Sequence, residues 1–127
     1  MADNLPNTIE NQVLDALVGV TPYSVTTPIR LALMTANGSD STPGTEVTGG
    51  SYARQTITFN AASGGSMTNS ATINFTGMPA CTVVGIEIYD SAGTPKRIWY
   101  GPLASNKTVA SGDTVQFAAS AITLSIS

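Results

Sequence analysis

Short runs of alternating apolar and polar residues, separated by turn residues, fill the chain after Pro22. Ile73 and Phe75, for example, alternate with Thr72 and Asn74, which is typical of a strand with one face in the core and one in water. We expect strands at residues 29–34, 56–59, 72–75, 82–89, 97–100, 107–109, 114–118 and 121–126. About eight strands with no helix between them predict a mainly β fold, an antiparallel β-sandwich of jelly-roll or immunoglobulin-like topology.

Strict alternation also predicts which side chains face the solvent. In the run 82–89, Val84, Ile86 and Ile88 share the inner side, which places Glu87 on the outer side. In the run 97–100, both neighbours of Trp99 share the other face, which favours an outward indole ring. Packing of that ring against the opposite sheet remains open at this point.

One short N-terminal α-helix is signalled before the strands. Asn7 is the expected N-cap, Glu10 stands three residues later as in a capping box, and Gly19 ends the helix. Its apolar residues recur at spacings of three and four: Ile9, Val13, Ala16 and Leu17. A helix of about 11 residues is marginal alone, so it must dock on its own sheet, which we favour, or on a partner. We therefore divide the chain into an N-terminal helical arm, residues 1–23, and a β-sandwich domain, residues 24–127.

The composition favours a protein surrounded by other protein surfaces. The 127 residues are 42% hydrophobic and only 10% charged, against about 25% charged in ordinary soluble proteins. The net charge is −3 and the five basic residues are scattered, so we expect no nucleic-acid binding. The N-terminus lacks the features of a signal peptide, and no apolar run is long enough for a membrane span. We expect a protein that folds in the host cytoplasm, with no membrane partner.

The residues that usually carry catalysis are scarce. The chain has no histidine and one cysteine, Cys81, which we interpret as a small buried side chain rather than a reactive thiol. Glu87 and Asp90 could form a glycosidase pair, but Asp90 opens a turn and a structural role is favoured. Asp40 and Glu46 share a loop without the spacing of a calcium site. The sequence therefore predicts no catalytic residue, no cofactor and no metal.

A long segment without apolar periodicity, residues 35–51, leads into the stretch GTEVTGGSYARQTITF at 44–59. We expect Tyr52 to anchor the end of this loop and Arg54 to pin it through a local salt bridge or carbonyl contact, with contact to a neighbouring subunit as the alternative. Trp99 beside Arg97 would make an interface anchor. The candidate interface residues are Ile9, Val13, Leu17, Tyr52, Arg54, Arg97 and Trp99.

Four motifs carry a resemblance to a known family. They are Gly-Ser-Tyr-Ala-Arg at 50–54, Val-Gly-Ile-Glu-Ile-Tyr-Asp at 84–90, Tyr-Gly-Pro-Leu at 100–103 and Lys-Thr-Val-Ala-Ser-Gly-Asp-Thr at 107–114. From Thr8 to its end, the chain resembles small bacteriophage virion proteins often labelled phage tail fibre or minor tail protein. The resemblance implies a helix followed by a β-sandwich that assembles on a virion without catalysis.

Two virion roles follow as hypotheses. The first is a capsid decoration or cement protein that binds the major capsid protein as a homotrimer, because one domain of this size leaves no room for a fibrous shaft. The alternative is a tail-fibre or minor tail module that contacts tail proteins and binds a host receptor, such as a glycan, through Trp99, Tyr100 and the long loops. A third hypothesis, a glycan hydrolase using Glu87 and Asp90, belongs to a different class.

Overall fold

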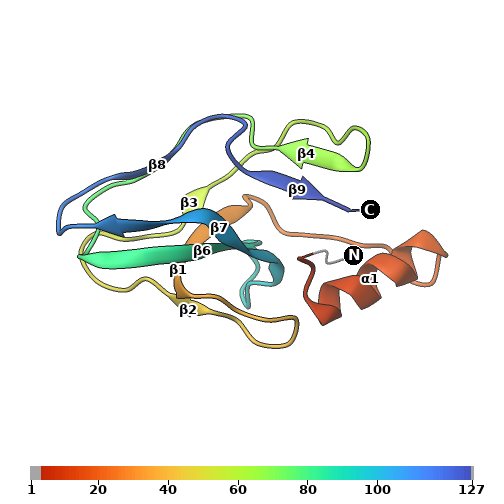
Figure 1. Ribbon diagram of the computed structural model, residues 1–127. Coiled ribbons are helices and arrows are strands. Elements are labelled where there is room, and N and C mark those ends of the chain that lie inside the picture. Colours follow the sequence, from red (N-terminus) through yellow and green to blue (C-terminus); the bar gives the residue numbers. More distant parts are fainter. Residues whose placement is uncertain (1–3, 127) are drawn as a thin grey trace.

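The computed structural model describes residues 4–126 as one helix followed by short strands (Figure 1). The helix is α1 (Asn7–Leu17). The strands are β1 (Arg30–Ala36), β2 (Thr45–Glu46), β3 (Gln55–Thr56), β4 (Ser66–Thr68), β5 (Ile73–Phe75), β6 (Cys81–Tyr89), β7 (Arg97–Val109), β8 (Val115–Phe117) and β9 (Thr123–Ser125). Two of them, β2 and β4, lie in segments that the sequence had suggested were loops.

Within these residues, the strands form one larger sheet and two small pairs, all antiparallel. The larger sheet has the order β2-β1-β6-β7, with β3 also paired to β1, and the pairs are β4-β9 and β5-β8. In Figure 1 the small pairs lie together above the larger sheet. The core between them contains Leu31, Leu33, Ile88 and Trp99 from the sheet, with Phe75, Phe117 and Ile122 from the other layer. The predicted mainly β, antiparallel sandwich with one N-terminal helix is confirmed.

The first turn of α1 differs from the expected capping box. The N-cap is Pro6, which has no side-chain cap, and Asn7 is the first helical residue. The Asn7 backbone N–H donates instead to the carbonyl of Asp40, 3.1 Å away, so the long loop takes over part of the capping. The expected Asn7 cap is therefore wrong, because a tertiary contact satisfies this helix end.

The C-terminal end of α1 follows the expectation. Gly19 adopts φ +79°, a conformation that favours glycine. Its N–H donates to the carbonyl of Ala16 at 3.3 Å, and the N–H of Val20 donates to the carbonyl of Asp15 at 2.8 Å. This pair of bonds is a Schellman motif, which ends the helix and turns the chain sharply.

Strand β1 is buried on both faces, contrary to the expectation of one face in water. Leu31 and Leu33 enter the main core, whereas Ala32 and Met34 form a second small core with Tyr89 on the outer face of the sheet. The sequence pattern predicts the inner face correctly. It misses the outer core because Tyr89, which covers Ala32 and Met34 there, lies more than fifty residues further along the chain.

The β6-β7 pairing reverses two predicted orientations. The register shifts between Val83 and Gly85, so Val83 rather than Val84 lies in the main core. Beyond this shift the pairing is regular as far as Ile88, which lies directly opposite Trp99. Because Ile88 faces the core, the Trp99 ring is also buried there, and the expected outward orientation is wrong.

Candidate assembly surface

Glu87 lies at the centre of a buried polar network on the outer face of the sheet. Its side chain is fully buried, so the expected exposure is wrong. The carboxylate accepts hydrogen bonds from Tyr89 Oη at 2.7 Å, from the Gly44 backbone N–H at 2.7 Å and from Arg97 at 3.3 Å. Arg97 also donates to the carbonyl of Ser39. The network therefore ties the long loop to β6 and β7.

A second ionic group holds the seam between the loop and β3. Arg54 makes two hydrogen bonds to Glu46, at 3.0 and 2.9 Å, and its guanidinium lies 3.9 Å from the centre of the Tyr89 ring. Tyr52 donates its hydroxyl hydrogen to Glu46 at 2.7 Å and accepts the N–H of Leu33 at 3.0 Å. Burial alone would raise the pKa of Glu46, but the hydrogen bonds from Arg54 and Tyr52 outweigh it and lower that pKa. The predicted roles of Tyr52 as an anchor and Arg54 as a local pin are confirmed.

Asp90 has the structural role that the turn sequence predicts. Its buried carboxylate accepts three backbone N–H groups, from Thr26, Ala92 and Lys96, at 2.7–3.3 Å. Burial would raise the pKa of Asp90, and these three bonds lower it below its ordinary value. Both carboxylates of the glycosidase hypothesis, Glu87 and Asp90, are thus buried and engaged in holding the fold.

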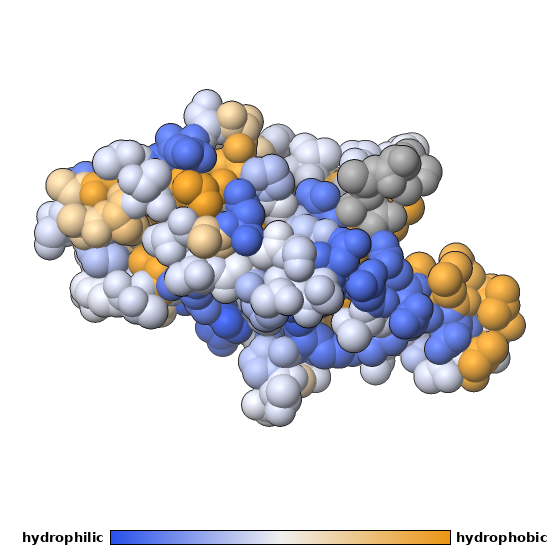
Figure 2. Space-filling view, turned by 60° about the horizontal axis from the view of Figure 1, so that its bottom comes forward, coloured by the Kyte–Doolittle hydropathy of each residue, from blue (hydrophilic) through white to orange (hydrophobic). Residues whose placement is uncertain are grey.

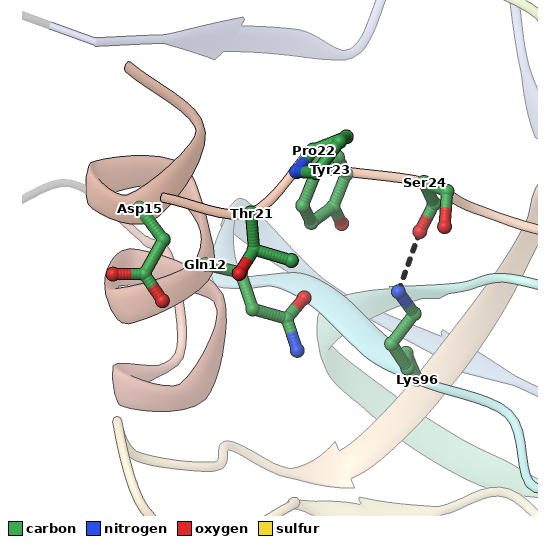
Figure 3. Close-up of a pocket in the computed structure, with 7 residues that line it drawn as sticks. All are labelled: Gln12, Asp15, Thr21, Pro22, Tyr23, Ser24 and Lys96. Carbon is green, nitrogen blue, oxygen red and sulfur yellow. Dashed lines mark hydrogen bonds between the residues drawn. The ribbon is translucent and has the colours of Figure 1, made fainter. Parts of the chain in front are cut away.

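A small polar hollow lies between α1 and the segment that follows it (Figure 3). Its volume is about 200 Å³, and its lining residues are Gln12, Asp15, Thr21, Pro22, Tyr23, Ser24 and Lys96. Gln12 Oε1 and Tyr23 Oη are buried there without a hydrogen-bond partner, and Lys96 donates to the Ser24 carbonyl at 2.6 Å. The volume is below the 300 Å³ or so of typical ligand pockets, so the hollow suits ordered water better than a ligand.

At the C-terminal end of α1, in contrast to the polar hollow, large apolar side chains face the solvent. Leu14, Leu17, Val18 and Val20 are 61–77% exposed, and we call these four residues the apolar tip. Figure 2 shows them as part of an orange cluster at the right-hand end of the molecule. Among residues 4–126, the other exposed large apolar side chains are Ile126 and Val25, at 54% and 39%. Concentration at one end is what marks a contact surface.

An apolar groove adjoins this tip, between α1 and the β4-β9 pair. Two hollows of about 270 and 360 Å³ meet there, and both are lined by Leu5 and Ile126. Met67 and Leu124 complete the side toward the strands. We call Leu5, Met67, Leu124 and Ile126 the apolar groove. Leu14 and Leu17 form its other wall, so the tip and the groove are continuous.

The charges beside this surface are negative. Helix α1 carries Glu10 in its first turn and has no basic residue in its last turn, where Asp15 is exposed. A helix C-terminus is itself the negative end of the helix dipole. The apolar tip is therefore bordered by negative charge.

The structure separates the seven predicted interface residues into three groups. Ile9 and Trp99 are buried in the chain's own core, and the half-buried Val13 packs against it. Tyr52, Arg54 and Arg97 belong to the polar network, and only Leu17 is widely exposed.

No observation tests whether any of these residues contacts a partner, so that assignment stays a prediction. The burial of Trp99 does remove the stacking surface that the glycan-binding hypothesis used. Sequence reasoning missed Leu14, Val18, Val20 and Ile126, although Leu14, Leu17 and Val18 repeat at helical spacing on a second face of the helix.

Metal and membrane sites can be addressed only for the described part of the chain. Residues 4–126 contain no group of three or more metal-ligating side chains close enough to hold an ion. No helix in that range has the length and hydropathy needed to cross a membrane.

The described residues form a β-sandwich whose Glu87 and Asp90 carboxylates are buried and hydrogen-bonded and whose helix end exposes apolar side chains. A comparison with protein families identifies the family. The chain belongs to the family of the podophage GP4 fiber I protein gp80, whose model matches residues 4–125. No curated protein matches the chain. The predicted resemblance to small phage virion proteins with a tail-fibre label is confirmed, and the protein is a virion structural component.

Proposed function

We propose that the protein is a non-enzymatic tail-fibre component of the phage virion. The observation that carries this proposal is the match to a fibre protein family over residues 4–125, almost the whole chain. The fibre role was the alternative hypothesis from the sequence, and the family supports it better than capsid decoration. The absence of histidine and the burial of Glu87 and Asp90 support the non-enzymatic part.

The proposed partners are tail proteins and further copies of the same chain. The homotrimer expected from the sequence is kept in this proposal, as three copies in each fibre. The surface that we assign to these contacts is the apolar tip with its groove, because the polar network is already satisfied within the chain. Receptor binding is not included, since the stacking residue expected for it, Trp99, is buried.

The number of copies in each particle tests the location. Quantitative mass spectrometry of purified virions gives the ratio of this protein to the major capsid protein. A tail fibre occupies positions set by the tail symmetry, so we expect a few to a few tens of copies. A decoration protein follows the capsid lattice, and hundreds of copies would contradict the fibre assignment.

A further inference from the structure

We propose that the apolar tip of one copy docks in the apolar groove of a second copy of the same chain. The inference rests on the proposed function, which assigns this surface to contacts with tail proteins and further copies, and it names the occupant; self-association of the purified protein tests it separately from the number of copies in the virion. It assigns a surface and an occupant to an end of the molecule that the fold leaves uncovered.

The first argument is the amount of apolar surface. The four tip residues and Ile126, at 54–77% exposure, present on the order of 500 Å² of apolar surface, near the upper limit for a patch on a monomer. A standard stable interface buries about 800 Å² on each partner, of which about 60% is apolar. The uncovered area at this end is therefore the amount that one such interface requires.

The second argument is that the chain supplies both halves of the contact. The tip projects as leucine and valine side chains, and the groove beside it is lined by Leu5, Met67, Leu124 and Ile126. Within one copy the tip does not fill the groove, because Leu17 and Val18 remain more than 70% exposed. A neighbouring copy offers the groove a tip of matching chemistry.

The third argument concerns symmetry. Tip and groove lie at the same end of the molecule, next to the helix, whereas the far end of β7 points away from it (Figure 1). A contact between two different patches generates a ring if the rotation between successive copies closes, and an open chain of copies if it does not. Neighbouring patches require a large rotation between successive copies, which favours a small closed ring.

The charges around the tip predict how this contact responds to salt. Each copy brings the carboxylate of Asp15 to the border, with no basic residue in the last turn of α1. Like charges then approach one another, so added salt strengthens association between copies by screening them. A basic partner protein would show the opposite response.

The test uses two substitutions at exposed positions, so that the monomer fold is retained. Val18→Asp places a carboxylate on a part of the tip that does not line the groove, and Ile126→Asp places one at the groove. Ser105→Asp, at an exposed position on β7 away from α1, is the matched control. Circular dichroism and unfolding curves verify the fold of each variant, and light scattering after size exclusion gives the masses at several protein and salt concentrations.

We expect wild type and the Ser105→Asp variant to self-associate, more strongly at high salt, and each of the other two variants alone to be monomeric. Mixing the Val18→Asp and Ile126→Asp variants leaves one intact tip and one intact groove, because Val18 does not line the groove, so the mixture should form a one-to-one complex. A monomeric wild-type protein overturns the proposal. Loss of association in both variants without a complex in the mixture also overturns it, because the tip would then meet something other than the groove.

Discussion

The outer face of the sheet, beside the long loop, and the C-terminal end of α1 differ in how well the chain covers its own polar and apolar side chains. We call them the loop side and the helix end. On the outer face of the sheet, Glu87, Glu46 and their arginine partners are held in hydrogen bonds, and Ala32 and Met34 are covered. At the end of α1, large apolar side chains face the solvent. The difference supports the proposal that the loop side stabilises a single copy, whereas the helix end contacts a partner.

The largest predicted effect lies in the buried network. Glu87→Gln removes the charge that balances Arg97, a side chain that is 9% exposed, and leaves that cation without a buried counter-charge. Breaking one partner of a buried ion pair costs about 3–5 kcal/mol of unfolding free energy. Urea unfolding measures this loss, with Asp15→Asn as the exposed-carboxylate control. An unchanged midpoint for Glu87→Gln would show that the network does not hold the loop side.

A smaller effect is expected from the core face of the helix. Ile9 is 2% exposed in the main core, so Ile9→Ala should lower the free energy of unfolding by about 2–5 kcal/mol. Leu17→Ala on the same helix is the matched control, because the Leu17 side chain is 74% exposed in the monomer. The comparison should be made at a concentration where the protein is monomeric. Equal losses for the two variants would contradict the division of α1 into a core face and a contact face.

The pair formed by Glu46 and Arg54 should give a pH-dependent effect of about 1–2 kcal/mol, since the two side chains are 27% and 29% exposed and partly screened. The folded protein lowers the pKa of Glu46, because the hydrogen bonds from Arg54 and Tyr52 outweigh burial. The stabilisation is therefore present above the unfolded pKa of about 4.3 and is lost as the pH falls through the lower, folded pKa.

Unfolding curves of wild type and Glu46→Gln at a series of pH values measure this effect. The two proteins should differ at neutral pH and converge in acid. A difference that persists unchanged in acid would mean that the ion pair is not its source.

The smallest predicted effect concerns the geometry of the apolar tip. Gly19→Ala forces a side chain into φ +79° and should cost about 1 kcal/mol, although no atom blocks the new methyl group. Gly93→Ala also meets open space, and Gly93 has no positive φ, so it is the control. If Gly19→Ala weakens self-association as well as stability, the Schellman turn positions the tip. No change in stability would contradict the strained turn.

The sequence predicts the sandwich and the helix because their periodicities are local, as in the alternation around Ile73 and Phe75. It fails for Trp99 because the side of β7 that enters the core is set by pairing with β6, where Trp99 lies opposite the core residue Ile88. The predicted exposure of Glu87 is wrong for a related reason. Its carboxylate is covered by Gly44 and Arg97, which lie 43 and 10 residues away in the chain, so local alternation does not reveal them. The local pin by Arg54 was predictable because its partner, Glu46, lies within the same short stretch.

The central claim is that the helix end, and not the loop side, holds the protein in the virion. The most direct measurement is the ratio of this protein to the major capsid protein in purified phage carrying Leu17→Asp, compared with phage carrying Arg54→Gln. We predict intact heads that lack the Leu17→Asp protein and near-normal incorporation of the Arg54→Gln protein. Normal incorporation of the Leu17→Asp protein would contradict the account.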